Sequence, residues 1–175
     1  MDFYEVIKTR RSIREYTDKP IPDEVLERVL NAARIAPSGG NHQPTRLIVL
    51  KDPDAIKALA EIYCGEEYRQ APVIIVACGK VVGFNRGQYM GDYSMLMDVA
   101  VAMDHLILAA RAEGLATCWK GSFDNAVLKP HFGIPENFQI VALTALGYPE
   151  GNPFVETDKR IPLNEFVCEN KWCFE

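Results

Sequence analysis

Residues 92–113 read DYSMLMDVAVAMDHLILAARAE, and this stretch predicts the longest helix of the chain. Its apolar residues cover much of the helical circumference instead of forming one stripe. They include Met95, Leu96, Val99, Ala100, Met103, Leu106, Ile107 and Ala110. A helix of this kind is buried nearly all round, so we expect it either inside the domain or in an interface between two copies. Gly114, directly after the helix, suits its C-cap.

Strands and shorter helices are predicted on both sides of this helix. The run VIIVAC at 73–78 is apolar throughout, which predicts a central strand covered on both faces. A capping box of Asp2 and Glu5 predicts a first helix that ends near Arg10. Further strands are predicted at 47–50, 115–118 and 138–146, and further helices at 25–33, 55–62 and 124–132. Together these elements predict one α+β domain over residues 1–175.

Composition and charge limit the classes of partner. Hydrophobic residues make up 48% and charged residues 25% of 175 residues, which is typical of a soluble globular domain with a sizeable core. The net charge of -5 offers no general attraction to nucleic acid or to an anionic membrane, so neither partner is expected. An anionic ligand must therefore be held by cations placed locally.

Targeting signals and cysteine spacing point to a reducing compartment. The first residues carry two acids and no apolar run, and no stretch is long enough to span a bilayer, so we expect a cytoplasmic protein. The cysteines are odd in number and scattered, so a disulfide framework is not expected. They are Cys64, Cys78, Cys118, Cys168 and Cys173. No histidine groups with them at a zinc-like spacing, and no metal site is expected.

Two cationic segments are candidates for anion binding. Arg10-Arg11-Ser12-Ile13-Arg14 places three guanidiniums and a hydroxyl in five residues, and guanidinium donors match phosphate oxygens. The alternative is that these cations only complement the dipole at a helix C-terminus. Lys159 and Arg160 supply two more cations late in the chain, where a solvated basic turn is the alternative.

Two loop segments offer polar groups to a ligand. In PSGGNHQP at 37–44, the glycines let backbone amides approach closely, and Ser38, Asn41 and Gln43 can hydrogen-bond a heteroaromatic edge. The alternative is an ordinary polar loop; neither a dinucleotide-binding nor a P-loop spacing is present. In GLATCWKGSF at 114–123, a strand end can aim backbone N–H groups into a site. The alternative is a strand-to-helix turn in which Ser122 or Asp124 caps the next helix.

Taken in order, these segments resemble the nitroreductase family of flavoproteins. The family pattern runs RRSxR, PSxxNxQP, GLxTxWxG, GYP and a late basic segment before Pro, and each part has its match here, with GYP at 147–149. The resemblance covers nearly the whole chain. It implies a three-layer α+β fold with a central, mostly antiparallel sheet flanked by helices. It also implies an interwoven homodimer with FMN at the interface, on which the tail from about 150 to 175 docks.

The resemblance also implies which residues bind the flavin. One segment matches the family's contacts to the FMN phosphate, ribityl chain and ring edge: Arg10, Arg11, Ser12 and Arg14. A second matches the loop given by the other subunit: Pro37, Ser38, Gly39, Asn41 and, more weakly, Gln43. Backbone amides near flavin N5 and O4 are expected from Gly121 and Ser122, with Trp119 and Lys120 beside them. A late phosphate contact is expected from Arg160 with Lys159. No side chain is expected as an obligate acid or base.

The activity implied is ping-pong electron transfer. NADH or NADPH delivers hydride to flavin N5, and a nitroaromatic, quinone or related small acceptor then takes the electrons. The alternatives are another flavin reaction, such as ene reduction, substrate oxidation or reductive dehalogenation, and a flavin-binding regulator or storage protein that is not an enzyme. The sequence departs from the family in two places that affect the substrate contacts. Only residues 79–91 separate the central strand from the long helix, where many larger relatives carry extra helical residues that form part of a substrate lid. Residues 63–69 lack the Asn and Lys that some relatives use beside the flavin. Candidate pocket walls are Phe84, Tyr89, Tyr93 and Phe123.

Overall fold

The computed structural model describes residues 1–63, 68, 70–81 and 94–174. The helices are α1 (Phe3–Thr9), α2 (Asp23–Arg34), α3 (Pro53–Ile62), α5 (Ser94–Ala112), α6 (Asn125–His131) and α7 (Leu163–Phe166), with a short 3₁₀ turn, η1 (Gly39–Asn41). The strands are β1 (Thr45–Leu50), β2 (Val73–Lys80), β3 (Ala116–Lys120) and β4 (Phe138–Gly147). The predicted elements are confirmed, with ends shifted by a few residues. In the described ranges, none of the helices has the length and apolar character needed to cross a membrane.

The four strands form one antiparallel sheet in the order β1-β2-β4-β3. The two central strands, β2 and β4, are those with the longest apolar runs. The side chains of Ile74, Ile75 and Val76 are fully buried, as expected of a strand covered on both faces. The predicted antiparallel sheet is confirmed.

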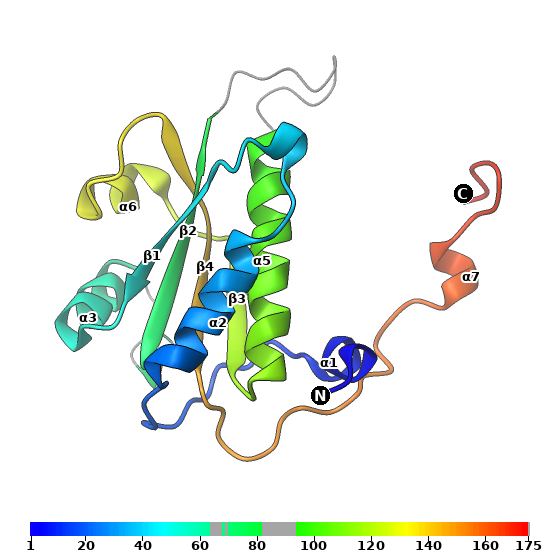
Figure 1. Cartoon of the computed structure of the whole chain (residues 1–175), viewed down its shortest axis with the longest axis horizontal. Coiled ribbons are helices and arrows are strands. Elements are labelled where there is room, and N and C mark those ends of the chain that lie inside the picture. The colour runs from blue at the N-terminus through cyan, green and yellow to red at the C-terminus, as the bar shows by residue number, and fades with distance from the viewer. Residues whose placement is uncertain (64–67, 69, 82–93, 175) are drawn as a thin grey trace.

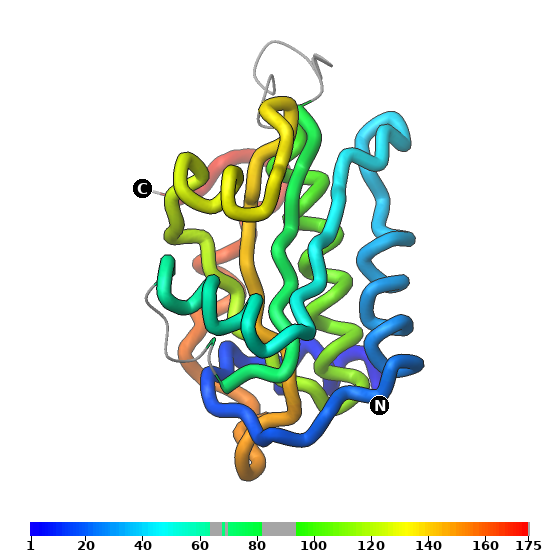
Figure 2. Tube along the Cα trace, turned by 90° about the vertical axis from the view of Figure 1, so that its left-hand side faces the viewer, coloured from blue at the N-terminus to red at the C-terminus, as the bar shows by residue number. Residues whose placement is uncertain are grey.

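Helices cover both faces of the sheet and make three layers (Figures 1 and 2). On one face, α2 and α5 pack Val29, Met103 and Leu106 into a core in which all three are fully buried. On the other face, Leu59 of α3 and Leu128 of α6 belong to a second core cluster. The three-layer architecture is confirmed.

The long helix α5 has two different faces. Its inner face fills the chain's own core, so burial inside the domain accounts for Met103 and Leu106. Its outer face leaves Leu96 40%, Met97 48% and Val101 37% exposed. Such a strip of apolar side chains on a core helix fits an interface with a second copy. We call these three residues the α5 outer strip.

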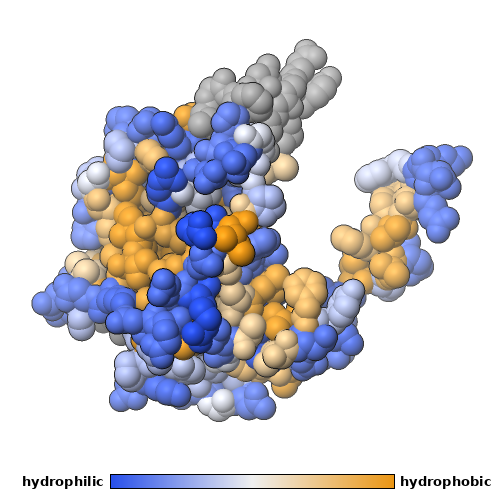
Figure 3. Space-filling view, viewed as in Figure 1, coloured by the Kyte–Doolittle hydropathy of each residue, from blue (hydrophilic) through white to orange (hydrophobic). Residues whose placement is uncertain are grey.

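The C-terminal tail leaves the body of the molecule (Figures 1 and 3). Leu163, Phe166 and Trp172 are 75%, 69% and 78% exposed, so they do not dock on the chain's own body. The Trp172 and Phe174 rings pack edge to face against each other, 5.1 Å between centroids. Docking of this apolar tail on a second copy stays a prediction.

Cysteine chemistry differs from the expectation in one place. Cys168 and Cys173 form a disulfide, with 5.7 Å between their Cα atoms, so the expectation that both are thiols was wrong. The spacing of five residues allows it because Asn170 adopts a left-handed conformation, φ 64°, which folds the segment back on itself. Cys78 and Cys118 are buried, and Cys64 lies outside the described residues.

Candidate functional site

The segment Arg10–Arg14 runs along the edge of β3. Ser12 forms a parallel bridge with Thr117, and the Ile13 N–H donates to the Thr117 carbonyl over 3.0 Å. Successive side chains of such an extended segment point to opposite sides. Ile13 is therefore buried in the core, while Ser12 and Arg14 face outward. Two of the predicted site segments are thus brought together.

The GYP motif anchors the same segment at its other end. The Thr17 N–H donates to the Tyr148 carbonyl over 2.9 Å, and Tyr16 bridges to Pro149. Gly147 is required by close packing, because a Cβ there would lie 2.8 Å from Cδ of Pro72 and 3.0 Å from Cδ1 of Tyr16. The motif therefore holds the cationic segment in place.

Cations from the two ends of the chain gather beside α1. Desolvation lowers the pKa of the Arg11 guanidinium, and the positive charges of Arg10 and Arg160 lower it further, so both charges act on Arg11. Glu156 is the acid that acts in the opposite direction. We call Arg10, Arg11 and Arg160 the cation cluster. A gathering of like charges favours the binding of an anion.

The early tail is held next to α1 by two contacts. Lys8 pairs with Glu156 at 3.9 Å. The buried guanidinium of Arg111, at the end of α5, lies 4.0 Å from the ring centroid of Phe154 and donates to Thr9 Oγ1 over 3.0 Å. These contacts explain how residue 160 reaches residue 11, which sequence distance does not predict.

The cations of the N-terminal segment have different surroundings. Arg11 donates to the carbonyl of Lys8 over 2.8 Å and to that of Arg10, so it also fills the helix-terminus role that we gave as the alternative. Within the described part of the chain, the guanidiniums of Arg10 and Arg14 have no hydrogen-bonded or ion-paired protein partner. Their donors are available to a ligand. Arg160 donates to the Lys159 carbonyl over 2.6 Å and keeps its remaining N–H groups.

The end of β3 presents an open backbone. Gly121 and Ser122 are exposed, and nothing lies within 4 Å of a Cβ built on Gly121. Asp124, not Ser122, caps α6 by accepting from the Ala126 N–H over 2.8 Å, so the Ser122 hydroxyl is not used as the cap. Trp119 is 37% exposed beside it.

A small pocket of about 280 Å³ adjoins this turn and is lined in part by Ser122 and Phe123. Phe123 packs edge to face on Tyr63, 6.4 Å between centroids, and against the core. The other candidate pocket walls, Phe84, Tyr89 and Tyr93, lie outside the described residues, as do most of 63–69 and 79–91.

The loop Pro37–Gln43 has a tightly constrained backbone. Gly40, Asn41 and Gln43 all have positive φ, 55°, 56° and 48°. The loop is tied internally: the Gln43 N–H donates to Ser38 Oγ over 2.9 Å, and Gln43 Nε2 donates to Asn41 Oδ1 over 3.1 Å. Left-handed residues other than glycine are uncommon and cluster at functional sites.

This loop lies far from the cation cluster within one chain. The Gly39 N–H donates to Asp98 Oδ1 over 3.0 Å, near the start of α5, whereas Arg111 holds α1 near its end. Asp98 and Arg111 are thirteen residues apart, roughly 20 Å along a helix. Figure 1 shows η1 and α1 at opposite ends of α5. One chain therefore brings together three of the four predicted segments, and the loop stands apart.

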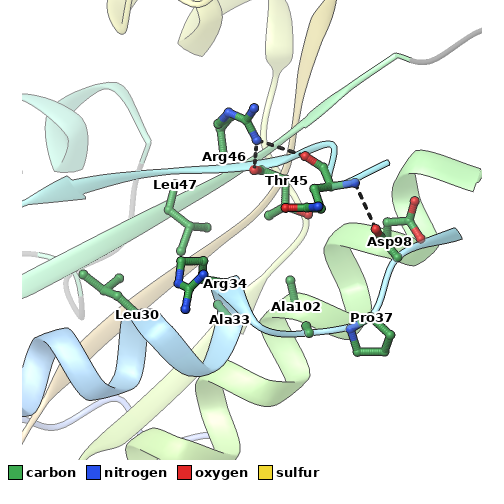
Figure 4. Close-up of a pocket in the computed structure, with 12 residues that line it drawn as sticks. Leu30, Ala33, Arg34, Pro37, Thr45, Arg46, Leu47, Asp98 and Ala102 are labelled. Carbon is green, nitrogen blue, oxygen red and sulfur yellow. Dashed lines mark hydrogen bonds between the residues drawn. The ribbon is translucent and has the colours of Figure 1, made fainter. Parts of the chain in front are cut away.

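A pocket of about 270 Å³ lies under the loop between α2, α5 and β1 (Figure 4). Leu30, Leu47 and Ala102 supply apolar walls, and Asp98 supplies a carboxylate. Arg46 closes one side by donating to the Gln43 carbonyl over 3.0 Å. Neither Asp98 nor Arg46 was predicted as a site residue; the signal for Asp98 was an acid within an otherwise apolar helical stretch.

The fold and the site define an α+β protein that carries a cation cluster and an open strand end. Comparison with known proteins gives the family. The model of the nitroreductase family matches residues 7–66 and 63–148. The chain belongs to the nitroreductase family, which classes it as an oxidoreductase.

Two named relatives each match 95% of this chain. An Archaeoglobus fulgidus protein, provisionally named NADH dehydrogenase/NAD(P)H nitroreductase, is 36% identical over 173 residues, 95% of this chain and 97% of its own length. Rat iodotyrosine deiodinase 1 is 29% identical over 195 residues, 95% of this chain and 68% of its own length.

Solved structures agree as well. A nitroreductase family protein from Clostridium difficile has a TM-score of 0.84 and 32% identity, covering 98% of this chain and 100% of its own. A provisionally named nitroreductase from Desulfovibrio desulfuricans, solved in complex with FMN, has a TM-score of 0.84 and 30% identity, covering 99% of each chain.

Proposed function

We propose that this protein binds FMN and catalyses NAD(P)H-driven reduction of small electrophilic acceptors. The observation that carries the proposal is the cation cluster, in which the described residues offer the Arg10 guanidinium no hydrogen-bonded or ion-paired partner, as they offer none to that of Arg14. Family membership and the FMN complex of the Desulfovibrio relative support the choice of ligand.

The residues present fit FMN from one end to the other. The cation cluster, with Lys159, offers forked donors for a phosphate. Ser12 and Arg14 face outward along β3, where Arg14 can stabilise negative charge on a reduced ring. The exposed N–H groups of Gly121 and Ser122, with Trp119 and Lys120 beside them, suit the ring edge. When bound, FMN supplies the hydride-accepting and hydride-donating centre, and the chain supplies placement and charge.

We propose that a second copy completes the site. The loop residues Pro37, Ser38, Gly39, Asn41 and Gln43 stand roughly 20 Å along α5 from the chain's own cation cluster. In a two-fold dimer that pairs the α5 helices head to tail, the loop of one copy lies near the cluster of the other. The exposed α5 outer strip and the exposed tail from about 150 to 175 are the surfaces that such a dimer would cover.

The acceptor class follows from the family. Nitroaromatics and quinones are proposed first, in a ping-pong cycle in which NADH or NADPH leaves before the acceptor enters. Reductive dehalogenation is the second candidate, favoured by the similarity to iodotyrosine deiodinase 1 over 95% of this chain. A cytoplasmic location stays a prediction.

Anaerobic titration tests the proposal. Purified protein is loaded with FMN and mixed with NADH or NADPH, and flavin bleaching is followed at its visible absorption band. Reoxidation is then measured with a nitroaromatic, a quinone and an iodophenol. Failure to take up FMN would refute flavin binding. Bound FMN that neither nucleotide reduces would make the protein a flavin binder without this activity.

A further inference from the structure

The loop Pro37–Gln43 keeps its shape through internal hydrogen bonds but needs an external tie to hold its position. Its entry is fixed where the Ala36 N–H donates to the Ala33 carbonyl over 3.3 Å. Its exit is fixed where the Lys80 N–H, at the end of β2, donates to the Pro44 carbonyl over 3.0 Å. Between these points the Asn41 N–H donates to the Ser38 carbonyl over 3.0 Å, within the loop itself. The loop is therefore tied to the body at both ends and bonded internally between them.

Asp98 ties the middle of this unit to α5. Its carboxylate accepts from the Gly39 N–H over 3.0 Å. A hydrogen bond from a backbone N–H to a charged acceptor is stronger than one between neutral groups. Asp98 lies in the second turn of a rigid helix that the core holds on its inner face.

Burial makes this acid unusual. Asp98 is only 5% exposed, on a helix whose other buried residues are mostly apolar. Burying a carboxylate is costly unless hydrogen bonds compensate. The hydrogen bond from the Gly39 N–H compensates part of this cost and links the acid to the loop.

We propose that Asp98 is a positioning residue for the FMN site, acting through the Gly39 amide. It fixes the loop so that Ser38, Asn41 and the loop amides meet the flavin bound by a second copy. This role rests on the proposed function. Asp98 itself lines the pocket under the loop, so the proposed role is indirect.

Three variants test the role. Asp98→Ala removes the acceptor. Asp98→Asn keeps an acceptor oxygen but removes the charge. Asp104→Ala removes a carboxylate from the same helix at an exposed position, without a hydrogen bond to the loop, and is the matched control. Dimer mass and far-ultraviolet circular dichroism establish that each variant folds.

The first readout is independent of FMN. Amide hydrogen exchange of the apo protein is expected to speed up across 39–43 in Asp98→Ala and to stay at the wild-type rate in Asp104→Ala. The second readout is FMN affinity, which is expected to fall roughly 10- to 100-fold in Asp98→Ala, because a hydrogen bond to a charged group is lost. The FMN affinity of Asp98→Asn is expected to lie between those of Asp98→Ala and the wild type, and its visible flavin spectrum should be closer to that of the wild type.

Unchanged exchange at 39–43 in Asp98→Ala would overturn the positioning role. Faster exchange with unchanged FMN affinity would overturn its connection to the flavin. If Asp98→Ala does not fold, Asp98→Asn carries the test. Faster exchange across 39–43 together with weaker FMN binding in that variant supports the positioning role, whereas wild-type exchange overturns it. A wild-type protein that takes up no FMN would refute the proposed function instead, and the exchange experiment would still decide whether Asp98 holds the loop.

Discussion

Replacing Arg11 in one copy and Asn41 in the other separates the two halves of the proposed FMN site. Arg11 belongs to the cation cluster and Asn41 to the loop, and within one chain their anchoring points lie roughly 20 Å apart along α5. A hydrogen bond to a charged group contributes about 1.5–3 kcal/mol, so Arg11→Ala is expected to weaken FMN binding roughly 10- to 100-fold. Asn41→Ala removes the side-chain amide of the loop and places alanine at a backbone φ of 56°, where it is strained.

A heterodimer of the two single variants is expected to recover one intact site of two. The Asn41→Ala copy still offers its cations, and the Arg11→Ala copy still offers its loop. At an FMN concentration at which neither homodimer binds, flavin content should return to about half the wild-type value. The copies are coexpressed with different affinity tags and purified on both, and flavin absorption per dimer is measured.

The matched control puts both substitutions in one copy and pairs it with a wild-type copy. If the site is shared, each site of this dimer lacks one half, and flavin content stays low. If each chain builds its own site, the outcomes exchange: this control binds about half of the wild-type flavin, and the heterodimer of single variants binds none. This reversed pattern of flavin content, or a protein that stays monomeric, would refute the shared site.

Further predictions concern the phosphate, the core, the thiols and the tail. Arg160→Ala is expected to weaken FMN binding but to leave riboflavin, which lacks the phosphate, nearly unaffected in parallel fluorescence titrations; an equal loss for both would argue against a phosphate contact. Met103→Ala is expected to lower the free energy of unfolding, measured in urea, by about 2–5 kcal/mol, because Met103 is fully buried. Met97→Ala should weaken dimerisation, measured by sedimentation, more than it weakens folding. A larger loss of folding stability in Met97→Ala than in Met103→Ala would contradict the assigned faces of α5. Burial raises the pKa of the Cys78 thiol from 9.0 to about 11, so the thiol should resist alkylation at pH 8. The stability that this buried neutral thiol contributes should be complete below pH 9 and lost as the pH rises through 11. Rapid alkylation of the folded protein would count against this. Dithiothreitol should release two further thiols from Cys168 and Cys173 without changing the melting temperature of the body, and a large change would mean that the tail stabilises the core.

Local features of the sequence predicted most of the elements. Asp2 caps α1 as the spacing to Glu5 indicates, accepting from the Tyr4 and Glu5 N–H groups. The apolar run at 73–78 became the buried strand β2. These predictions succeed because capping and burial patterns depend on neighbours a few residues apart. The prediction for Cys168 and Cys173 was wrong because their spacing does not reveal the left-handed turn at Asn170 that brings them together.

The long helix shows where local information ends. Its composition requires burial, but its period does not say which face meets the sheet and which is left for a second copy. The structure assigns Met103 and Leu106 to the chain's own core and leaves the α5 outer strip exposed. The sequence marks Asp98 only as an acid within a largely apolar helix, and the structure places its carboxylate against the Gly39 N–H.

The amino-acid sequence alone determines the elements, the three-layer class, the family and the chemistry of the four candidate segments, because each depends on residue type and short-range spacing. Only the tertiary structure decides that Arg160 reaches Arg11 and that the loop at Gly39 stands at the other end of α5. The physical reason is that the distance between remote segments is set by the packing of a rigid helix against a sheet, which positions both of its ends at once.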